Sequence, residues 1–167
     1  MKQIAYMVLA SVLLANFIQP LTEMAEACRK KIIISSALNN AFRVARDRSL
    51  SEQGIQILEA EVDVDLFYEY FADAFCDSLD LSVTRSSEGE SGYIEFESID
   101  DTFNIIRVDI DINKSYDYED RETTRVDLEL ETAYKFNIGA LKWLNEASND
   151  NEYVLEFDRS YLLLIKN

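Results

Sequence analysis

An apolar segment at the start of the chain limits the fold more than any other feature. IAYMVLASVLLANFIQPL fills residues 4–21, directly after Met-Lys-Gln, and holds 18 residues without a formal charge. As a helix it is about 27 Å long, close to the ~30 Å hydrocarbon core of a bilayer. Apolar residues then continue at helical spacing, at Ile33, Ala37, Ala41, Val44 and Ala45.

This pattern predicts one N-terminal apolar helix over about residues 3–47. We expect the helix to bend at Pro20, where the proline ring removes one backbone hydrogen bond. A helix on the order of 65 Å long exceeds the core of a small domain, so it needs a membrane or a partner protein to cover it.

The charge is divided between the two parts of the chain. The net charge is −16, and residues 1–48 hold seven basic and three acidic side chains, a net charge of +4. Residues 49–167 therefore carry 9 basic and 29 acidic side chains, a net charge of −20. Such an acidic region repels phosphates, which excludes nucleic acid as a partner. Six basic residues form what we call the basic collar of the helix: Arg29, Lys30, Lys31, Arg43, Arg46 and Arg48.

The segment SLSEQG, which ends at Gly54, breaks the helical pattern, and a second helix is predicted over about residues 65–79. Asp63 or Asp65 is suited to cap its first free amides. An apolar stripe on this helix predicts core packing rather than a ligand site. The stripe consists of Leu66, Phe67, Tyr70, Phe71, Ala74, Phe75, Ser78 and Leu79.

Alternating apolar and polar residues after position 81 predict antiparallel strands with one face in water. The strands are GYIEFE (92–97), IIRVDIDIN (105–113), RVDLELE (125–131) and EYVLEF (152–157). YLLLI at 161–165 predicts a further strand buried on both faces. The expected fold is therefore α+β, with a short second helix packed on a four- to five-stranded antiparallel sheet. The expected domains are the assembly helix, residues 1–49, and an acidic head, residues 50–167, which folds by itself.

The chain lacks the residues of common active sites. It has no histidine, and its four glycines (54, 89, 92 and 139) form neither a phosphate-binding loop nor a dinucleotide fingerprint. The strand carboxylates lie at positions where solvation explains them. We therefore predict that the protein is not an enzyme, with no catalytic, cofactor-binding or metal-binding residues.

The spacing of three residues resembles the opening of a calcium loop: Asp109, Asp111 and Asn113. Lys114, however, occupies the position where such a loop has its glycine, so only weak surface binding of Ca²⁺ is expected. Cys28 and Cys76 form no C-x-x-C motif. They are either two small buried side chains or, in an exported protein, a disulfide.

Three fates of the N-terminal segment stay open: a cleaved signal peptide, a permanent anchor, and a helix packed on another protein. Ala25-Glu26-Ala27 before Cys28 loosely fits a signal cleavage site, which would release a small secreted hydrolase. The helical pattern, however, runs through that point. Arg29, Lys30 and Lys31 follow the apolar run, so the positive-inside rule taken alone would leave the head in the cytoplasm.

An apolar N-terminal helix with a proline at position 20, a continuation of the helix, and an antiparallel sheet resembles the type IV pilin superfamily. DLFYEYFADAFCDSLDL before paired strands, and ETAYKFNIGALKWL before the last strand, resemble the layout of TadE-like pilin proteins. The chain departs from the pilin pattern at Ala5, where pilins usually carry glutamate, and shows no glycine before the apolar run.

The resemblance implies a structural subunit of an extracellular filament at the cell surface, a homopolymer built by packing of the N-terminal helices. It also implies residence in the inner or cytoplasmic membrane before assembly, and contact with a pilus assembly machinery. Four small residues permit close helix packing: Ala5, Ala10, Ser11 and Ala15. Two polar residues, Asn16 and Gln19, can form hydrogen bonds across helices. The alternative is a single-pass membrane-anchored binding domain that does not polymerise.

Overall fold

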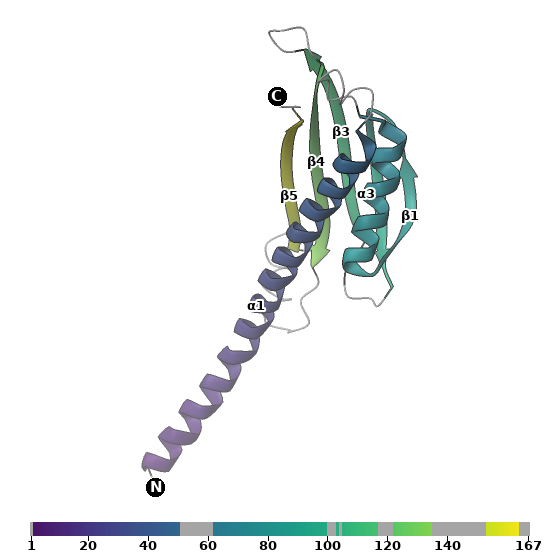
Figure 1. Ribbon diagram of the computed structural model, residues 1–167. Coiled ribbons are helices and arrows are strands. Elements are labelled where there is room, and N and C mark those ends of the chain that lie inside the picture. The colour runs from purple at the N-terminus through teal and green to yellow at the C-terminus, as the bar shows by residue number, and fades with distance from the viewer. Residues whose placement is uncertain are drawn as a thin grey trace. The chain divides into compact units, whose positions relative to one another are not determined.

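The computed structural model describes residues 2–50, 62–99, 103, 105–116, 122–134 and 153–163. Within these residues the chain forms a long N-terminal helix, a shorter helix and a five-stranded sheet, which confirms the predicted α+β fold (Figure 1). The elements in order are α1 (Lys2–Ser49), α3 (Val64–Leu79), β1 (Leu81–Ser87), β2 (Ser91–Ser98), β3 (Ile106–Tyr116), β4 (Glu122–Tyr134) and β5 (Tyr153–Leu163).

The chain divides into two compact units, and the division falls inside α1. One unit holds Met1–Ile33 with Tyr134–Tyr153, and the other holds Ile34–Ala133 with Val154–Asn167. The sequence predicts a boundary between residues 49 and 50, where α1 ends. The packing boundary lies earlier because the last part of α1 belongs to the core of the sheet unit.

Helix α1 continues through Pro20 without a break. Two hydroxyl groups near this part of the helix bond to backbone carbonyls one turn earlier. Ser11 Oγ donates to the Met7 carbonyl at 2.9 Å, and Thr22 Oγ1 donates to the Gln19 carbonyl at 2.7 Å. The polar residues of the apolar segment are thus compatible with an uninterrupted helix. A bend at Pro20 stays a prediction.

The sheet is a meander with the strand order β1-β2-β3-β4-β5. Its register places apolar residues opposite one another on the inner face, as in the row Ile94↔Val108↔Leu130. All three side chains of this row are buried. The alternation of the sequence therefore predicts the inner face correctly, because strand side chains point to opposite faces with a period of two.

The last strand differs from its prediction. Residues 152–157 and 161–165 were expected to be separate strands, whereas β5 is a single strand over Tyr153–Leu163. Leu162 is 59% exposed and Leu163 is buried, so the prediction that both faces are buried is wrong for Leu162. Residues 164 and 165 of the predicted strand lie outside the described residues. A run of leucines does not show whether one or both faces of the strand are buried when the strand lies at the edge of a sheet.

Both helices contribute to the core of the sheet unit. Helix α3 packs on β1 and β2, and Phe75 lies 4.9 Å from Phe96 between ring centroids. The second half of α1 reaches the same core through Phe42, whose ring stacks on Tyr161 of β5 at 3.7 Å and meets Phe67 of α3 at 6.1 Å. Helix α3 and the second half of α1, which belong to the sheet unit, lie on one face of the sheet (Figure 1). The predicted core role of the α3 stripe is confirmed for Phe67, Phe71, Phe75 and Leu79, while Leu66 is 37% exposed.

The end of α1 lies beside the start of α3. Leu50 and Val62 form an isolated antiparallel bridge, and the Asp63 amide donates to the Ser49 carbonyl at 2.9 Å. Asp63 is the N-cap of α3, and its Oδ1 accepts a hydrogen bond from the Leu66 amide at 3.1 Å. Of the two predicted caps, Asp63 is therefore the one used.

Replacing Asp63 with alanine is expected to lower the free energy of unfolding by about 1 kcal/mol, because an amide at the first turn of α3 loses its acceptor. Asp65→Ala is the matched control, since Asp65 lies in the same turn without the capping bond. Chemical denaturation of both variants measures the difference. Equal losses would mean that charge near the helix end, rather than the cap, is the cause.

Strand β1 was not predicted individually, and it begins at once after α3. Asp80 has φ 51 and ψ 54, a left-handed conformation, and its amide donates to the Cys76 carbonyl. This single residue ends the helix and turns the chain into the strand. Six of the seven β1 residues are exposed, so the strand lacks the apolar alternation that revealed the others.

Gly92 lies where the β1–β2 hairpin passes close to Tyr68 of α3. A Cβ atom at this position would overlap the Ser87 carbonyl oxygen and lie 2.7 Å from Tyr68 Oη. Tyr68 is buried and donates a hydrogen bond to the Ile110 carbonyl at 3.3 Å, directly across from Gly92 in the β2–β3 register. Only glycine leaves room for both the hairpin backbone and this buried phenol.

We expect Gly92→Ala to lower the free energy of unfolding by about 3 kcal/mol, because the clash is with backbone and the hairpin must shift. Ser87→Ala, at an exposed position of the same hairpin, is expected to change it by less than about 0.5 kcal/mol. Thermal unfolding in detergent compares the two variants. A Gly92→Ala protein as stable as Ser87→Ala would show that the hairpin is free to move.

Candidate functional site

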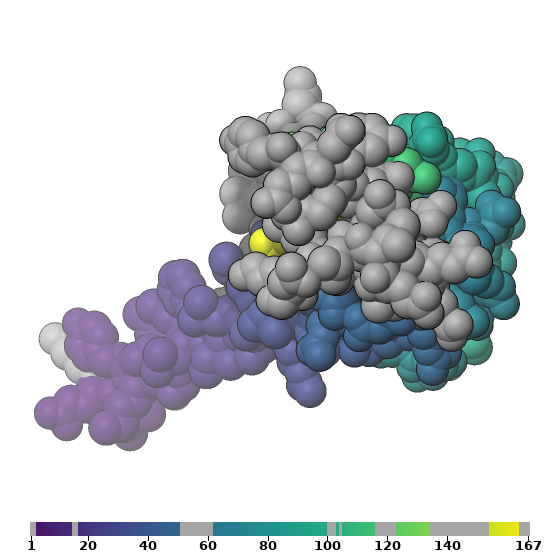
Figure 2. All heavy atoms as spheres, turned by 45° about the horizontal axis from the view of Figure 1, so that its top comes forward, coloured from purple at the N-terminus to yellow at the C-terminus, as the bar shows by residue number. Residues whose placement is uncertain are grey.

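The first half of α1 presents large apolar side chains that are each more than half exposed. Leu13 is 51% exposed, Phe17 65% and Leu21 64%. Figure 2 draws the atoms of this segment in purple. Helix propensity alone does not make such a surface stable in water, since each exposed side chain forgoes about 1.5–3 kcal/mol of burial. The exposed apolar residues of this segment are Ile4, Tyr6, Met7, Val8, Leu9, Val12, Leu13, Leu14, Phe17, Ile18 and Leu21.

This segment is long and apolar enough to cross a membrane. Among the described residues it is the one such helix, within Gln3–Ser49, and none of its most apolar window is buried. The same composition occurs in signal sequences and in helices that pack on other proteins. By length and composition the helix is consistent with a membrane anchor.

Several residues that the sequence predicts at a helix–helix interface lie on the exposed surface. Ala5, Ala10 and Gln19 are exposed, and so is Ser11, although its hydroxyl is already bonded within its own helix. The side chains of Ala15 and Asn16 lie outside the described residues. The Ser11 hydroxyl is therefore already used within its own helix.

The basic collar is distributed over both compact units. Arg29 is exposed, whereas two collar residues of the sheet unit already have contacts there. Arg46 Nε donates to Asp47 at 2.7 Å, and the Arg48 guanidinium lies 5.3 Å from the centroid of the Tyr70 ring. The collar as predicted is therefore not uniformly available to a neighbouring molecule.

The strand carboxylates lie on the outer face of the sheet, some of them paired with arginine. Arg107 Nε donates to Asp109 at 2.9 Å, and its guanidinium lies 4.2 Å from the Tyr93 centroid. Arg125 Nε donates to Asp127 at 3.0 Å. The hydrogen bond from Ser160, and then that from Arg125, lowers the pKa of Asp127. These exposed pairs each contribute only about 0–1 kcal/mol.

The same face places like charges directly opposite one another, Asp109↔Glu129 and Asp111↔Asp127. Such pairs are mildly destabilising in a sheet. In the part of the chain that the structure describes, no group of three or more His, Cys, Asp or Glu side chains could hold a metal ion. The predictions that the protein has no metal and no enzymatic activity stay predictions.

Both cysteines are free, so the structure does not contain the disulfide that was one of the two alternatives for Cys28 and Cys76. Cys28 is exposed on α1, contrary to the alternative of two buried side chains. Cys76 is half-buried in α3. Burial, followed by the charges of Asp73 and Asp77, raises the pKa of its thiol to about 11. Cys76 is therefore a poor nucleophile at neutral pH.

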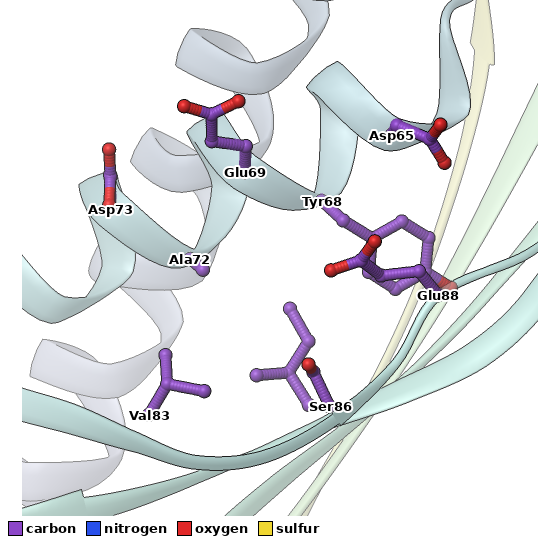
Figure 3. A pocket seen from close by; sticks show the side chains of 9 residues that line it. Asp65, Tyr68, Glu69, Ala72, Asp73, Val83, Ser86 and Glu88 are labelled. Carbon is purple, nitrogen blue, oxygen red and sulfur yellow. The ribbon is translucent and has the colours of Figure 1, made fainter.

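A depression of about 380 Å³, which we call the acidic pocket, lies between α3 and the β1–β2 hairpin (Figure 3). Its lining holds four carboxylates and no basic side chain. The carboxylates are those of Asp65, Glu69, Asp73 and Glu88. The remaining lining residues are Tyr68, Ala72, Val83, Ser86 and Ile94.

Sequence analysis missed Tyr68 and this pocket. Tyr68 shares a helix face with Phe71, Ala72 and Phe75 at spacings of three, four and seven residues, so the signal was present. The partner hairpin could not be predicted, because β1 gives no strand pattern of its own.

The buried Tyr68 is expected to make stability fall at high pH. Burial, and then the charges of Asp111, Glu88 and Asp109, raise its pKa from 10.0 to about 12. Between these values the unfolded phenol ionises while the folded one stays protonated. Its contribution to stability is therefore full below pH 10 and is lost by about pH 12, about 3 kcal/mol in all.

Tyr68→Phe should flatten this dependence, although it also removes the bond to Ile110. Denaturation of both proteins between pH 9 and pH 12 measures the two slopes. Parallel slopes would contradict the assignment to Tyr68.

A comparison of the chain with models of known families, with curated proteins and with solved structures finds no match.

Proposed function

We propose that this chain is a structural subunit of an extracellular type IV pilus-like filament, built by packing of α1 from many copies. The chain waits in the inner or cytoplasmic membrane before assembly, and a pilus assembly machinery moves it into the filament. The observation that carries the proposal is the uncovered apolar surface of α1, from Ile4 to Leu21, in a chain that also folds an acidic sheet unit.

Exposed apolar residues continue past the length that a bilayer covers, which favours a protein partner over lipid alone. Met24 is 52% exposed and Ile32 is 69% exposed. From Ile4 to Ile32 the helix measures about 42 Å, against about 30 Å of hydrocarbon. A neighbouring helix can cover the apolar residues beyond the hydrocarbon layer. If the helix simply crosses a bilayer along its normal, those residues stay in water.

Assembly gains little hydrophobic energy, because a helix in the bilayer is already out of water. Close packing at Ala5 and Ala10 must supply part of the driving force, and energy from the assembly machinery supplies the rest. In the finished filament the same apolar surface is sealed, so disassembly into water is costly.

A single-pass membrane-anchored domain that does not polymerise is the second candidate. The cations Arg29, Lys30 and Lys31, which follow the apolar segment after residues 22–28, favour it, because basic residues beyond the end of a span anchor it at the interface.

Electron microscopy of the surface of cells that produce the full chain separates the two candidates. The filament predicts fibres that can be sheared from cells and that contain the chain. The anchored domain predicts that the chain stays in the membrane fraction and gives monomers or small oligomers in detergent. Absence of fibres in cells that hold a complete assembly machinery would overturn the proposal.

A further inference from the structure

The first three cations of the basic collar follow the apolar segment of α1, and they differ in exposure. Arg29 and Lys31 are exposed, whereas Lys30 is half-buried. Arg29 and Lys31 are two positions apart, so the shorter arc between them spans about 160° of the helix circumference. Cys28, which is also exposed, lies on this arc. The two exposed cations therefore flank one open side of the helix.

The nearby acidic residues lie on the other side of the helix. Glu23 is buried, and Glu23 and Glu26 precede Lys30 by seven and four residues, which places all three on one side. Lys30 is therefore positioned to offset the two carboxylates. Within residues 24–32, the arc between Arg29 and Lys31 holds no carboxylate, and its residues are Met24, Ala25, Cys28 and Ile32.

The two exposed cations reach the depth of lipid headgroups when the apolar segment spans a bilayer. At 1.5 Å per residue, a hydrocarbon layer of about 30 Å extends from Ile4 to about residue 24. Arg29 and Lys31 follow about 7.5 and 10.5 Å later, and the headgroup layer is about 5–8 Å thick. Helix side chains lean toward the N-terminus, which here is toward the bilayer, so both long side chains extend back into the headgroup layer.

We propose that Arg29 and Lys31 bind the headgroups of anionic phospholipids in the leaflet that borders the C-terminal end of the apolar segment. The proposal rests on the membrane residence in the proposed function, and it names the lipid class that the chain contacts before assembly. The guanidinium and ammonium groups donate hydrogen bonds to phosphate oxygens of these lipids.

Charge selects an anionic lipid over a zwitterionic one. A zwitterionic headgroup carries its own ammonium group beside the phosphate, so its net charge is zero and a further cation gains little. Residues 49–167, with a net charge of −20, are repelled by a negative membrane surface. Cations in the headgroup layer offset this repulsion, at about fivefold in lipid occupancy for each one.

Energy transfer in lipid vesicles tests this contact with the full-length chain. Cys28 is exposed between the two cations, so a donor dye on its thiol, in a Cys76→Ser background, reports which lipids surround them. The vesicles contain phosphatidylserine and phosphatidylcholine, and one of the two carries an acceptor dye on its acyl chain. Transfer to labelled phosphatidylserine should exceed transfer to labelled phosphatidylcholine.

Two pairs of substitutions test which cations are responsible. Arg29→Gln with Lys31→Gln should lower the preference for phosphatidylserine about fivefold for each cation removed. The matched control is Arg43→Gln with Arg48→Gln, which removes two exposed cations from the sheet unit and should leave the preference unchanged. High salt should weaken the preference by screening, whereas inorganic phosphate at constant ionic strength should leave it in place.

Equal transfer to both lipids, an equal loss in the control variant, or displacement by inorganic phosphate would overturn the lipid contact while leaving the filament in place. No transfer to either lipid would overturn membrane residence and the lipid contact together. If the preference is present but cells with a complete assembly machinery form no fibres, the filament alone is overturned.

Discussion

Cells that produce the Leu13→Asp variant are expected to show no fibres. Leu13 lies near the middle of the apolar segment and is 51% exposed. In the proposed filament its side chain would meet lipid before assembly and other helices afterwards. An unpaired carboxylate there costs about 3 kcal/mol at the centre of a membrane helix and must stay unpaired in an apolar filament core. We expect loss of sheared fibres by at least about 100-fold, measured by electron microscopy and by immunoblot of the sheared fraction.

Ser36→Asp is the control for this variant. Ser36 is exposed on the same helix but beyond the apolar segment, so the same new charge stays in water and fibres should form. Normal fibres from Leu13→Asp would contradict the central claim that residues 4–21 form a shared core. If the wild-type chain forms no fibres and Leu13→Asp is lost from the membrane fraction, the result would instead support the anchored domain.

A fragment of residues 50–167 is expected not to fold, whereas a fragment of residues 34–167 is expected to unfold cooperatively. Ile34, Leu38 and Phe42 are at most 2% exposed, and Phe42 stacks on Tyr161 of β5. Burial of three such side chains contributes on the order of 5–9 kcal/mol. That is comparable with the whole stability of a domain, about 5–15 kcal/mol.

Near-UV circular dichroism during heating measures this difference. The 34–167 fragment should keep its aromatic signal and lose it in one transition, and the 50–167 fragment should lack that signal at the start. Equal melting temperatures would show that the sheet and α3 alone form a sufficient core. That result would restore the boundary between residues 49 and 50 that the sequence suggests.

The periodic elements of this fold were predictable because their patterns are local. The apolar run of residues 4–21, its continuation to Ala45, the aromatic stripe of α3 and the alternation in β3 and β4 each report which side of one element is apolar. The exposed half of α1, which carries the proposed function, belongs to this class. An apolar helix too long for a small core predicts a partner from the sequence alone.

Only the tertiary structure decided features that depend on pairing between distant segments. β1 has six exposed residues and no alternation, so its place at the sheet edge follows from its pairing with β2 rather than from its own pattern. The acidic pocket exists because that hairpin lies against α3, and Gly92 is required because Tyr68 reaches across it to Ile110. The sequence likewise indicates that residues 34–49 are helical and apolar on one face. Which segment packs against that face is seen only in the structure, where Phe42 stacks on Tyr161, more than a hundred residues away in the chain. Local sequence determines which surfaces must be buried, and long-range packing determines what buries them.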